Sequence, residues 1–194
     1  MTVKTIHNEI LQSCSYILAV EDTDECHLID CGDVAPIVDY ITLHNKHLKG
    51  IFLTHSHYDH IYGINKLLQL YPKITIYASK GTIEGLSDPD INLSYMYDDG
   101  EYIVENITTI VIPPLGITIL NKNAIIPLST PGHDRDCTTY IIDNCIFTGD
   151  SYNPDFPVFT KWRRSNETDA EKSIATILQL VEEKHLTIYP GHYK

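Results

Sequence analysis

The sequence predicts one layered domain of the α/β or α+β class over residues 1–194. Short segments rich in β-branched and aromatic residues recur along the chain, and stretches with helical spacing of apolar residues separate several of them. The composition, with 43% hydrophobic and 21% charged residues, is typical of a globular protein, and the length suits a single domain with its own core.

β-strands are expected where a short run of β-branched or aromatic residues is bounded by polar or turn residues. These runs are residues 15–20, 27–29, 50–53, 74–78, 108–112, 124–128, 139–142, 145–147 and 186–189. Asp143-Asn144, which lies between two of the runs, is typical of a tight hairpin turn.

Helices are expected where apolar residues recur at spacings of three and four. One such stretch contains Ile37, Ile41 and His44. Another contains Ile61, Ile64, Leu67, Leu68 and Tyr71, and Pro72 ends it. The last contains Ile174, Ile177, Leu178 and Val181 and runs to Lys184, after a predicted capping box formed by Thr168 and Glu171.

The charge and the cysteine content exclude several classes of protein. The formal net charge of −12 repels phosphate backbones, so nucleic acid is not expected as the main partner. The five cysteines are odd in number and form no C-x-x-C pair, which predicts reduced, buried thiols. No apolar run is long enough to span a membrane and the N-terminus lacks a signal-peptide pattern, so a cytoplasmic location without a membrane partner is predicted.

Four metal-competent side chains lie within six residues after the predicted strand 50–53. They are His55, His57, Asp59 and His60. Imidazole and carboxylate groups are the ligands that a metal such as zinc takes in proteins. His55 and His57 point the same way if the backbone is extended, and Asp59 and His60 come where the chain turns into a helix. One loop could therefore serve two ions.

Three later loops repeat one pattern, in which a strand is followed by small or turn residues and then by a possible ligand. The loops end in His133 (Thr-Pro-Gly-His), Asp150 (Phe-Thr-Gly-Asp) and His192 (Pro-Gly-His). Glycine lets the backbone turn sharply and bring such a side chain to a shared rim. Each loop alone could be an ordinary turn with a polar tip, but three of them beside the first cluster favour a metal site.

The ordered motifs H-x-H-x-D-H, T-P-G-H, F-T-G-D and P-G-H resemble those of the metallo-β-lactamase superfamily, and the resemblance runs from about Ile29 to His192. It implies a four-layer αββα sandwich, an α+β fold, with two metal ions at one edge of the sheets. It also implies ligand roles, which are His55, His57 and His133 for the first ion, Asp59, His60 and His192 for the second, and Asp150 as the bridge between them. The ions are expected to be zinc, with iron or manganese as alternatives.

Asp30 matches the family's early aspartate after a strand. A histidine that binds a metal needs an acceptor for its other N–H, and a carboxylate supplies one. Asp30 is therefore expected to support a ligand rather than to bind an ion, although an ordinary turn aspartate would also fit.

Two adjacent ions can share a water and lower its pKa toward neutrality, so the expected activity is hydrolysis by a metal-bridging hydroxide, with Asp59 and Asp150 as catalytic carboxylates. In this family true β-lactamases generally lack an aspartate at the position of Asp150, so the resemblance favours a small acyl substrate such as a thioester, as in glyoxalase II. A lactone or other ester is the alternative. The run Asp134-Arg135-Asp136-Cys137 departs from glyoxalase II, and the sequence given ends at Lys194, before the region that helps glyoxalase II bind glutathione.

Four side chains are predicted to form a substrate rim, namely Tyr58, Tyr62, Trp162 and Arg163. Arg164 could join them, because an arginine can hold an anionic group bidentately. A tryptophan packed on the domain and two solvated arginines would explain the same residues equally well.

Other classes remain open at this point. A mononuclear iron dioxygenase of the same fold keeps the same first histidines, whereas a flavodiiron protein typically has a glutamate inside the first motif, where this chain has Ser56 and Tyr58. A nuclease is opposed by the charge, and a non-catalytic member by the complete set of ligands. The sequence does not predict the oligomeric state.

Overall fold

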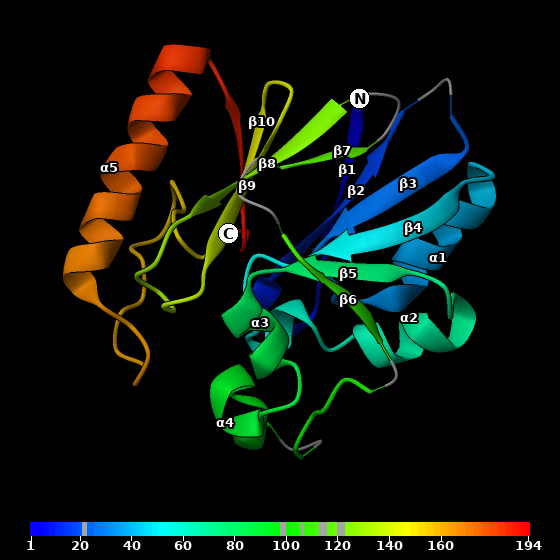
Figure 1. The fold of residues 1–194 in the computed structure, drawn as a ribbon, viewed down its shortest axis with the longest axis horizontal. Helices are drawn as coiled ribbons and strands as arrows, with labels where there is room; N and C mark the ends of the chain where they lie inside the picture. The colour runs from blue at the N-terminus through cyan, green and yellow to red at the C-terminus, as the bar shows by residue number, and fades with distance from the viewer. Residues whose placement is uncertain (21–22, 98–99, 106, 113–115, 120–122) are drawn as a thin grey trace.

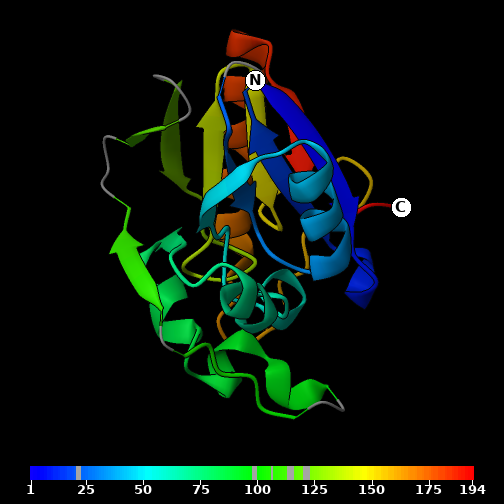
Figure 2. The ribbon, with the colours of Figure 1, turned by 90° about the vertical axis from the view of Figure 1, so that its right-hand side faces the viewer.

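The computed structural model describes residues 1–20, 23–97, 100–105, 107–112, 116–119 and 123–194. Two sheets lie face to face, with helices on their outer faces (Figures 1 and 2). The predicted αββα sandwich is therefore confirmed, and the mixed sheets place it in the α+β class.

The first sheet has the strand order β1-β2-β3-β4-β5-β6. Its strands are β1 (Thr2–His7), β2 (Cys14–Ala19), β3 (Glu25–Ile29), β4 (His47–Phe52), β5 (Thr75–Ala78) and β6 (Thr108–Val111). The pairs from β1 to β3 are antiparallel, and those from β3 to β6 are parallel. Parallel neighbours need crossover connections, and the helices α1 (Val34–Leu43) and α2 (Ile64–Leu70) supply two of these.

The second sheet has the order β11-β10-β9-β8-β7. Its strands are β7 (Ile117–Ile119), β8 (Asn123–Ser129), β9 (Thr138–Ile142), β10 (Cys145–Gly149) and β11 (Thr187–Pro190). Only β10 and β11 pair in parallel, and the long helix α5 (Glu167–Lys184) connects them. The hairpin turn predicted at Asp143-Asn144 joins β9 to β10, with Asp143 in the left-handed region at φ 53°.

Three groups of buried side chains fill the three interfaces between the four layers. Ile37, Leu28 and Ile51 belong to the group under α1 and α2. Phe52 and Tyr140 belong to the group between the sheets, where their rings meet edge to face at 5.7 Å. The third group packs α5 on the second sheet and consists of Ile141, Ile146, Ile177 and Leu186. The strands β2, β9 and β10 are therefore buried along their whole length, which explains why they are largely apolar, whereas Ile126 of β8 is 46% exposed.

The predicted helices form with shifted boundaries. α2 begins at Ile64, later than predicted, because a 3-10 turn, Tyr58–His60, comes first. The prediction of a capping box at Thr168 is wrong. The side chain of Asn166 caps α5 instead, by accepting from the backbone N–H of Asp169 at 3.0 Å. Leu178 is 42% exposed, so it lies outside the buried face of α5.

Some elements have no counterpart among the predictions. They are β1, β7, the helices α3 (Lys80–Gly85) and α4 (Pro89–Asn92), and the 3-10 turns Ile10–Gln12 and Ser94–Met96. The strand β1 alternates exposed residues with half-buried ones and with the buried Ile6, and it lies at the edge of its sheet. A short amphipathic edge strand of this kind carries a weak local signal.

The strand directions bring distant loops together. β3 and β4 run in parallel, so both end at the same edge of the first sheet. β8, β10 and β11 also run in one direction, because two successive antiparallel pairings restore the direction of the chain. The loops after these strands carry the predicted site residues.

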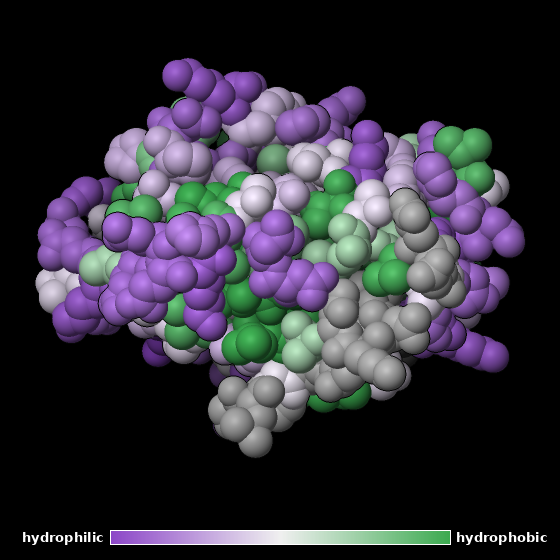
Figure 3. All heavy atoms as spheres, turned by 90° about the horizontal axis from the view of Figure 1, so that it is seen from above, coloured by the Kyte–Doolittle hydropathy of each residue, from purple (hydrophilic) through white to green (hydrophobic). Residues whose placement is uncertain are grey.

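The surface and the thiols agree with the composition. All five cysteines are buried and unpaired, as predicted, and Cys31 belongs to the core group under the helices. Hydrophilic side chains cover much of the face that Figure 3 shows, around smaller hydrophobic areas. None of the helices among the described residues is long and apolar enough to cross a membrane.

His27 gives the fold a pH dependence that can be measured. Its side chain is 4% exposed in β3, its Nδ1 has no hydrogen-bond partner, and its ring lies 5.8 Å from that of Phe52. Burial lowers its pKa from 6.5 to about 4, while Glu25 and Lys49 act in opposite directions. Between about pH 4 and 6.5, His27 therefore binds a proton in the unfolded chain but not in the folded chain.

As the pH falls from about 6.5 to about 4, this histidine should lower the free energy of unfolding by about 3 kcal/mol. His27→Leu should remove that part of the pH dependence in urea melts, whereas His44→Leu, at an exposed position, should leave it unchanged. Identical pH profiles for the wild type and His27→Leu would contradict the assignment.

Candidate active site

The loop after β4 carries the densest group of predicted ligands. The backbone of His57 is extended (φ −61°, ψ 144°), and the 3-10 turn Tyr58–His60 follows it directly. All four side chains of the group are buried, and that of His60 is fully inaccessible. Burial of so many titratable groups in one loop is costly unless each has a partner, so the surroundings of the loop decide what it can do.

Two of the other ligand loops depend on glycine. Gly132, before His133, has φ +149°, and a Cβ atom there would lie 2.4 Å from Cα of Ala170. Gly149, before Asp150, has φ +49°, and a Cβ atom there would lie 2.6 Å from Oγ1 of Thr54. Both loops therefore approach neighbouring elements too closely for a side chain, which confirms the role expected for glycine in these motifs.

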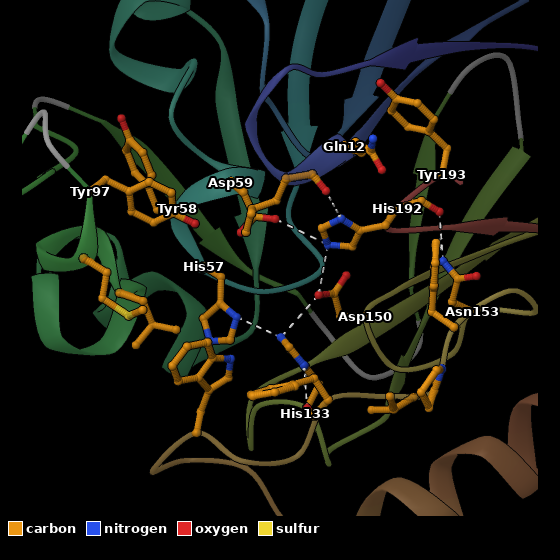
Figure 4. Close-up of a pocket in the computed structure, with 18 residues that line it drawn as sticks. Gln12, His57, Tyr58, Asp59, Tyr97, His133, Asp150, Asn153, His192 and Tyr193 are labelled. Carbon is orange, nitrogen blue, oxygen red and sulfur yellow. Dashed lines mark hydrogen bonds and ion pairs between the residues drawn. The ribbon is translucent and has the colours of Figure 1, made fainter.

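The structure brings all seven predicted ligands into one cluster. Figure 4 shows five of them, His57, Asp59, His133, Asp150 and His192. Their nitrogen and oxygen atoms form three overlapping groups in which all atoms lie within 4.8 Å of one another. The groups are His55, His57 and His133; His55, His60 and Asp150; and Asp59, His60 and His192. The first and last groups are the two ligand sets that the family resemblance implied.

Asp150 lies between the two sets. Its Oδ1 is 3.3 Å from Nε2 of His60, and its Oδ2 is 3.3 Å from Nε2 of His133 and 3.2 Å from Nε2 of His192. Asp59 closes the other side, with Oδ2 3.3 Å from Nε2 of His60. A carboxylate whose Oδ2 lies near both ligand sets and whose Oδ1 lies near His60 has the placement of a bridging group.

Contacts outside the cluster hold two of the rings through carboxylate and hydroxyl groups. The Nδ1 of His60 lies 3.0 Å from Oδ2 of Asp30. The Nδ1 of His55 lies 3.0 Å from Oγ1 of Thr54, which donates to the same carboxylate at 2.8 Å. Asp30 itself sits in the left-handed region at φ 54° and also accepts from the backbone N–H of Thr54. It therefore lies where an acceptor for a ligand histidine was expected, behind the cluster.

Backbone carbonyls hold two further rings. The Nδ1 of His133 donates to the carbonyl of Phe159 at 2.9 Å, and the Nδ1 of His192 donates to the carbonyl of Leu11 at 2.9 Å. A carbonyl can only accept, so Nδ1 carries the proton in both rings. The lone pair of each Nε2 then faces the interior of the cluster.

The pKa values follow from burial and from the two carboxylates. Burial lowers the pKa of His55 well below its usual value and that of His57 to about 3, so both rings stay neutral at pH 7. For His60 burial acts the same way, but Asp59 and Asp150 outweigh it and raise the pKa. The carboxylates thus create a negative potential that a bound cation would also feel.

These features fit a metal site. Imidazole and carboxylate are the donor set that zinc or iron takes. Two buried atoms of the cluster, Nε2 of His55 and Oδ1 of Asp150, have no hydrogen-bond partner. Nδ1 of His57 and Nε2 of His133 lie only 2.9 Å apart, as nitrogens that converge on one point do. A cation would satisfy all of these groups at once.

A cavity of about 660 Å³ opens onto the cluster, and only two of the four predicted rim residues line it. Tyr58 and Trp162 do so. Tyr62 is a correction, because its hydroxyl donates to Asp33 at 2.7 Å and its side chain lies outside the lining. Arg163 is also a correction, since it lines a smaller, adjoining pocket that shares His57, Leu93 and Trp162 with the cavity. The positions of Tyr62 and Arg163 in the sequence, near a ligand and next to an aromatic residue, did not predict where their side chains point.

Arg164 has a structural partner instead of a substrate. Its Nε and Nη2 donate to the two carboxylate oxygens of Asp134 at 2.6 and 3.0 Å, and Nη2 also contacts Asp136. The Asp134 side chain is buried, and this fork holds its pKa below the usual range despite burial. The pair fixes the segment that carries Trp162 against the loop of His133.

Several cavity residues were not predicted. They are Leu11, Gln12, Leu93, Met96, Tyr97, Asn153, Phe156, Pro157, Val158, Phe159 and Tyr193. Most lie in irregular segments without periodicity. The one signal in the sequence is the run Phe156-Pro157-Val158-Phe159, which is too apolar for an ordinary surface loop.

Comparison with known proteins identifies the family. The profile of the metallo-β-lactamase superfamily matches residues 10–192. A hydroxyacylglutathione hydrolase from Pseudoalteromonas translucida (strain TAC 125) is 30% identical over 136 residues, which are 70% of this chain and 45% of that protein. The chain thus spans less than half the length of this curated relative.

Solved structures show the same fold. A B3 metallo-β-lactamase, BLEG-1, superposes with a TM-score of 0.88 at 22% identity, over 100% of this chain and 92% of its own. TTHA1623 in a di-iron-bound form superposes with a TM-score of 0.79 at 17% identity, over 100% and 93%. Since the family profile covers nearly all of the sequence and the fold agrees throughout, the chain belongs to the metallo-β-lactamase superfamily.

Proposed function

We propose that this chain is a dinuclear metal-dependent hydrolase that acts on a small acyl substrate, in first place a thioester. The observation that carries the proposal is the pair of ligand sets joined by Asp150, whose Oδ2 lies near His133 of one set and His192 of the other. The similarity to a hydroxyacylglutathione hydrolase supports the thioester. Lactones and other esters undergo the same reaction and are the alternative substrates.

The positions of the residues assign them to two metal ions. His55, His57 and His133 would hold one ion, and Asp59, His60 and His192 the other. Two divalent ions held there would lower the pKa of a shared water toward neutrality and attract the oxygen of a substrate carbonyl. Asp59 and Asp150 would offset part of the charge of the ions.

The number of ions is the first testable part of this proposal. Protein purified without chelator should contain about two equivalents of metal per chain, measured by elemental analysis. We expect zinc, and iron and manganese should be measured in the same samples, because a protein of this fold is described in a di-iron-bound form. A firm single equivalent that added zinc does not change would contradict the dinuclear site, and a single iron would favour the dioxygenase reading.

The substrate class is tested by turnover. The metal-loaded protein should hydrolyse members of a panel of thioesters and lactones and leave tRNA precursors uncut, because RNA binding needs basic contacts spread over a broad surface and the chain has 14 Lys+Arg against 26 Asp+Glu. β-Lactams and phosphodiesters belong in the same panel. Efficient tRNA cleavage without acyl hydrolysis would overturn the proposal. A cytoplasmic location remains part of it.

A further inference from the structure

The cavity beside the metal-ligand cluster contains no basic side chain. Among the described residues that line it there is neither a lysine nor an arginine. The ionisable groups there, apart from tyrosine hydroxyls, are the ligands themselves, namely His57, Asp59, His133, Asp150 and His192. A negatively charged part of a substrate that lies in this cavity would therefore meet no basic side chain among the lining residues, in a chain whose net charge is −12. Arg163 and Arg164 line the adjoining pocket, where Arg164 is already bound to Asp134.

Two segments that are distant in the sequence supply an apolar lining instead. Leu93, Met96 and Tyr97 come from the segment after α4, and Phe159 and Trp162 come from the segment before α5. The two rings of the second segment lie 5.1 Å apart. Such a lining binds hydrocarbon or aromatic groups by removing them from water.

Both segments are held in place before any ligand arrives. The side chain of Asn92, which is fully buried, donates to the carbonyls of Gly85 and Tyr102 at 3.0 and 2.9 Å and accepts from the backbone of Ser94 at 2.9 Å. Tyr97 packs on Tyr58 with ring centroids 4.6 Å apart. The first wall is thus fixed to the core and to the ligand loop.

The second wall is fixed to His133. The ring of His133 donates to the backbone carbonyl of Phe159. The hydroxyl of Ser165 donates to the backbone carbonyl of His133 at 2.6 Å. Arg164, bound to Asp134, holds the residues between them. A preformed apolar cavity of about 660 Å³ lies within the range that binds small organic ligands.

The mouth of the cavity is apolar as well. Met96 is 51% exposed, Phe159 49% and Phe156 39%. Exposed apolar side chains that gather at one place usually mark a binding site. The polar side chains among the lining residues, besides the ligands, are Gln12, Asn153 and the tyrosines. Asn153 is engaged, since it donates to the carbonyl of His192 at 2.8 Å and accepts from the backbone of Asp155.

We infer that the substrate is an uncharged thioester or ester with an apolar alkyl or aryl group, which lies between Met96 and Trp162, and not a thioester of an anionic thiol such as glutathione. The inference rests on the proposed function and narrows its substrate class. In the reaction the oxygen of water bonds to the carbonyl carbon, the C–S or C–O bond breaks, and the products are a carboxylate, a neutral thiol or alcohol, and a proton.

The test compares matched substrates. Acyl groups from acetyl to octanoyl are attached to N-acetylcysteamine, which is uncharged, and to glutathione, which carries two carboxylates. With the metal-loaded protein, kcat/KM should rise about two- to fourfold for each methylene, and each N-acetylcysteamine ester should be hydrolysed faster than its glutathione counterpart. Met96→Ala and Trp162→Ala should flatten this dependence on chain length. Tyr95→Ala, at a neighbouring exposed position outside the lining, should leave it unchanged.

A binding experiment separates the two levels of the proposal. Trp162 is the one tryptophan of the sequence, so its fluorescence reports on the cavity directly. The thioether S-hexyl-N-acetylcysteamine, which cannot be hydrolysed, should bind more tightly than S-hexylglutathione. Tighter binding and faster turnover of the glutathione compounds would overturn the inference and leave the proposed hydrolase intact. Tight binding of the neutral thioether without hydrolysis of any substrate would overturn the proposed reaction and leave the apolar site standing.

Discussion

Replacing Asp150 by alanine should lower kcat/KM at least about 100-fold while the fold survives. The carboxylate lies within 3.3 Å of the ring nitrogens of His60, His133 and His192, so it contacts both proposed ligand sets. Without it, each ion would lose a ligand and the spacing of the pair would no longer be set. The side chain follows β10 in a loop and belongs to none of the three core groups, so its loss opens no cavity in them.

Three measurements are needed on this variant. Turnover and metal content should both fall, whereas the circular dichroism spectrum should match that of the wild type. Asp150→Asn keeps the shape and one oxygen, so it should retain more metal than Asp150→Ala. Glu171→Ala, on the exposed face of α5, is the matched control for loss of a carboxylate. Near-normal turnover of Asp150→Ala would show that this residue is not a bridge.

Replacing Arg164 by methionine should destabilise the protein by about 3–5 kcal/mol. The guanidinium group donates two hydrogen bonds to Asp134, whose side chain is 4% exposed and forms no ion pair with another lysine or arginine among the described residues. Methionine keeps most of the length of the side chain but leaves a buried carboxylate without its partner, which costs much more than the pair contributes.

Thermal melts should show the loss as a fall in Tm of roughly 10 °C. Arg163→Met, at an exposed position next along the chain, should change the stability by less than about 0.5 kcal/mol. Adding Asp134→Asn to Arg164→Met should restore part of the loss, because the uncompensated charge disappears. Equal Tm values for Arg164→Met and Arg163→Met would mean that the ion pair between Arg164 and Asp134 does not stabilise the fold.

The sequence is most informative where chemistry and local geometry coincide. The four ligands after β4 are close in sequence, so an extended segment and one turn are enough to make them converge. The loops of His133 and Asp150 were recognisable because glycine at a fixed place before each ligand meets a steric demand that the structure shows. Strands such as β2, β9 and β10 are largely apolar for a similar local reason, since both of their faces are buried.

Other features depend on tertiary packing and leave little local trace. Tyr62 lies four residues after Tyr58, yet one ring lines the cavity and the other turns to Asp33. Asn166 caps α5 while Thr168 looks equally suitable, because the position where the helix begins is set by the loop that packs on His133. The apolar walls of the cavity come from irregular segments that no periodicity marks.

The ligand cluster also has a consequence for the kinetics of folding. His60 and His192 are 132 positions apart in the chain and follow strands of different sheets, β4 and β11, yet their Nε2 atoms are 3.3 Å apart. Ions that bind there, as proposed, can find their full set of donors only after both sheets have formed and met. Such ions would slow unfolding and leave the rate of refolding almost unchanged, since contacts made after the transition state act on the unfolding rate alone.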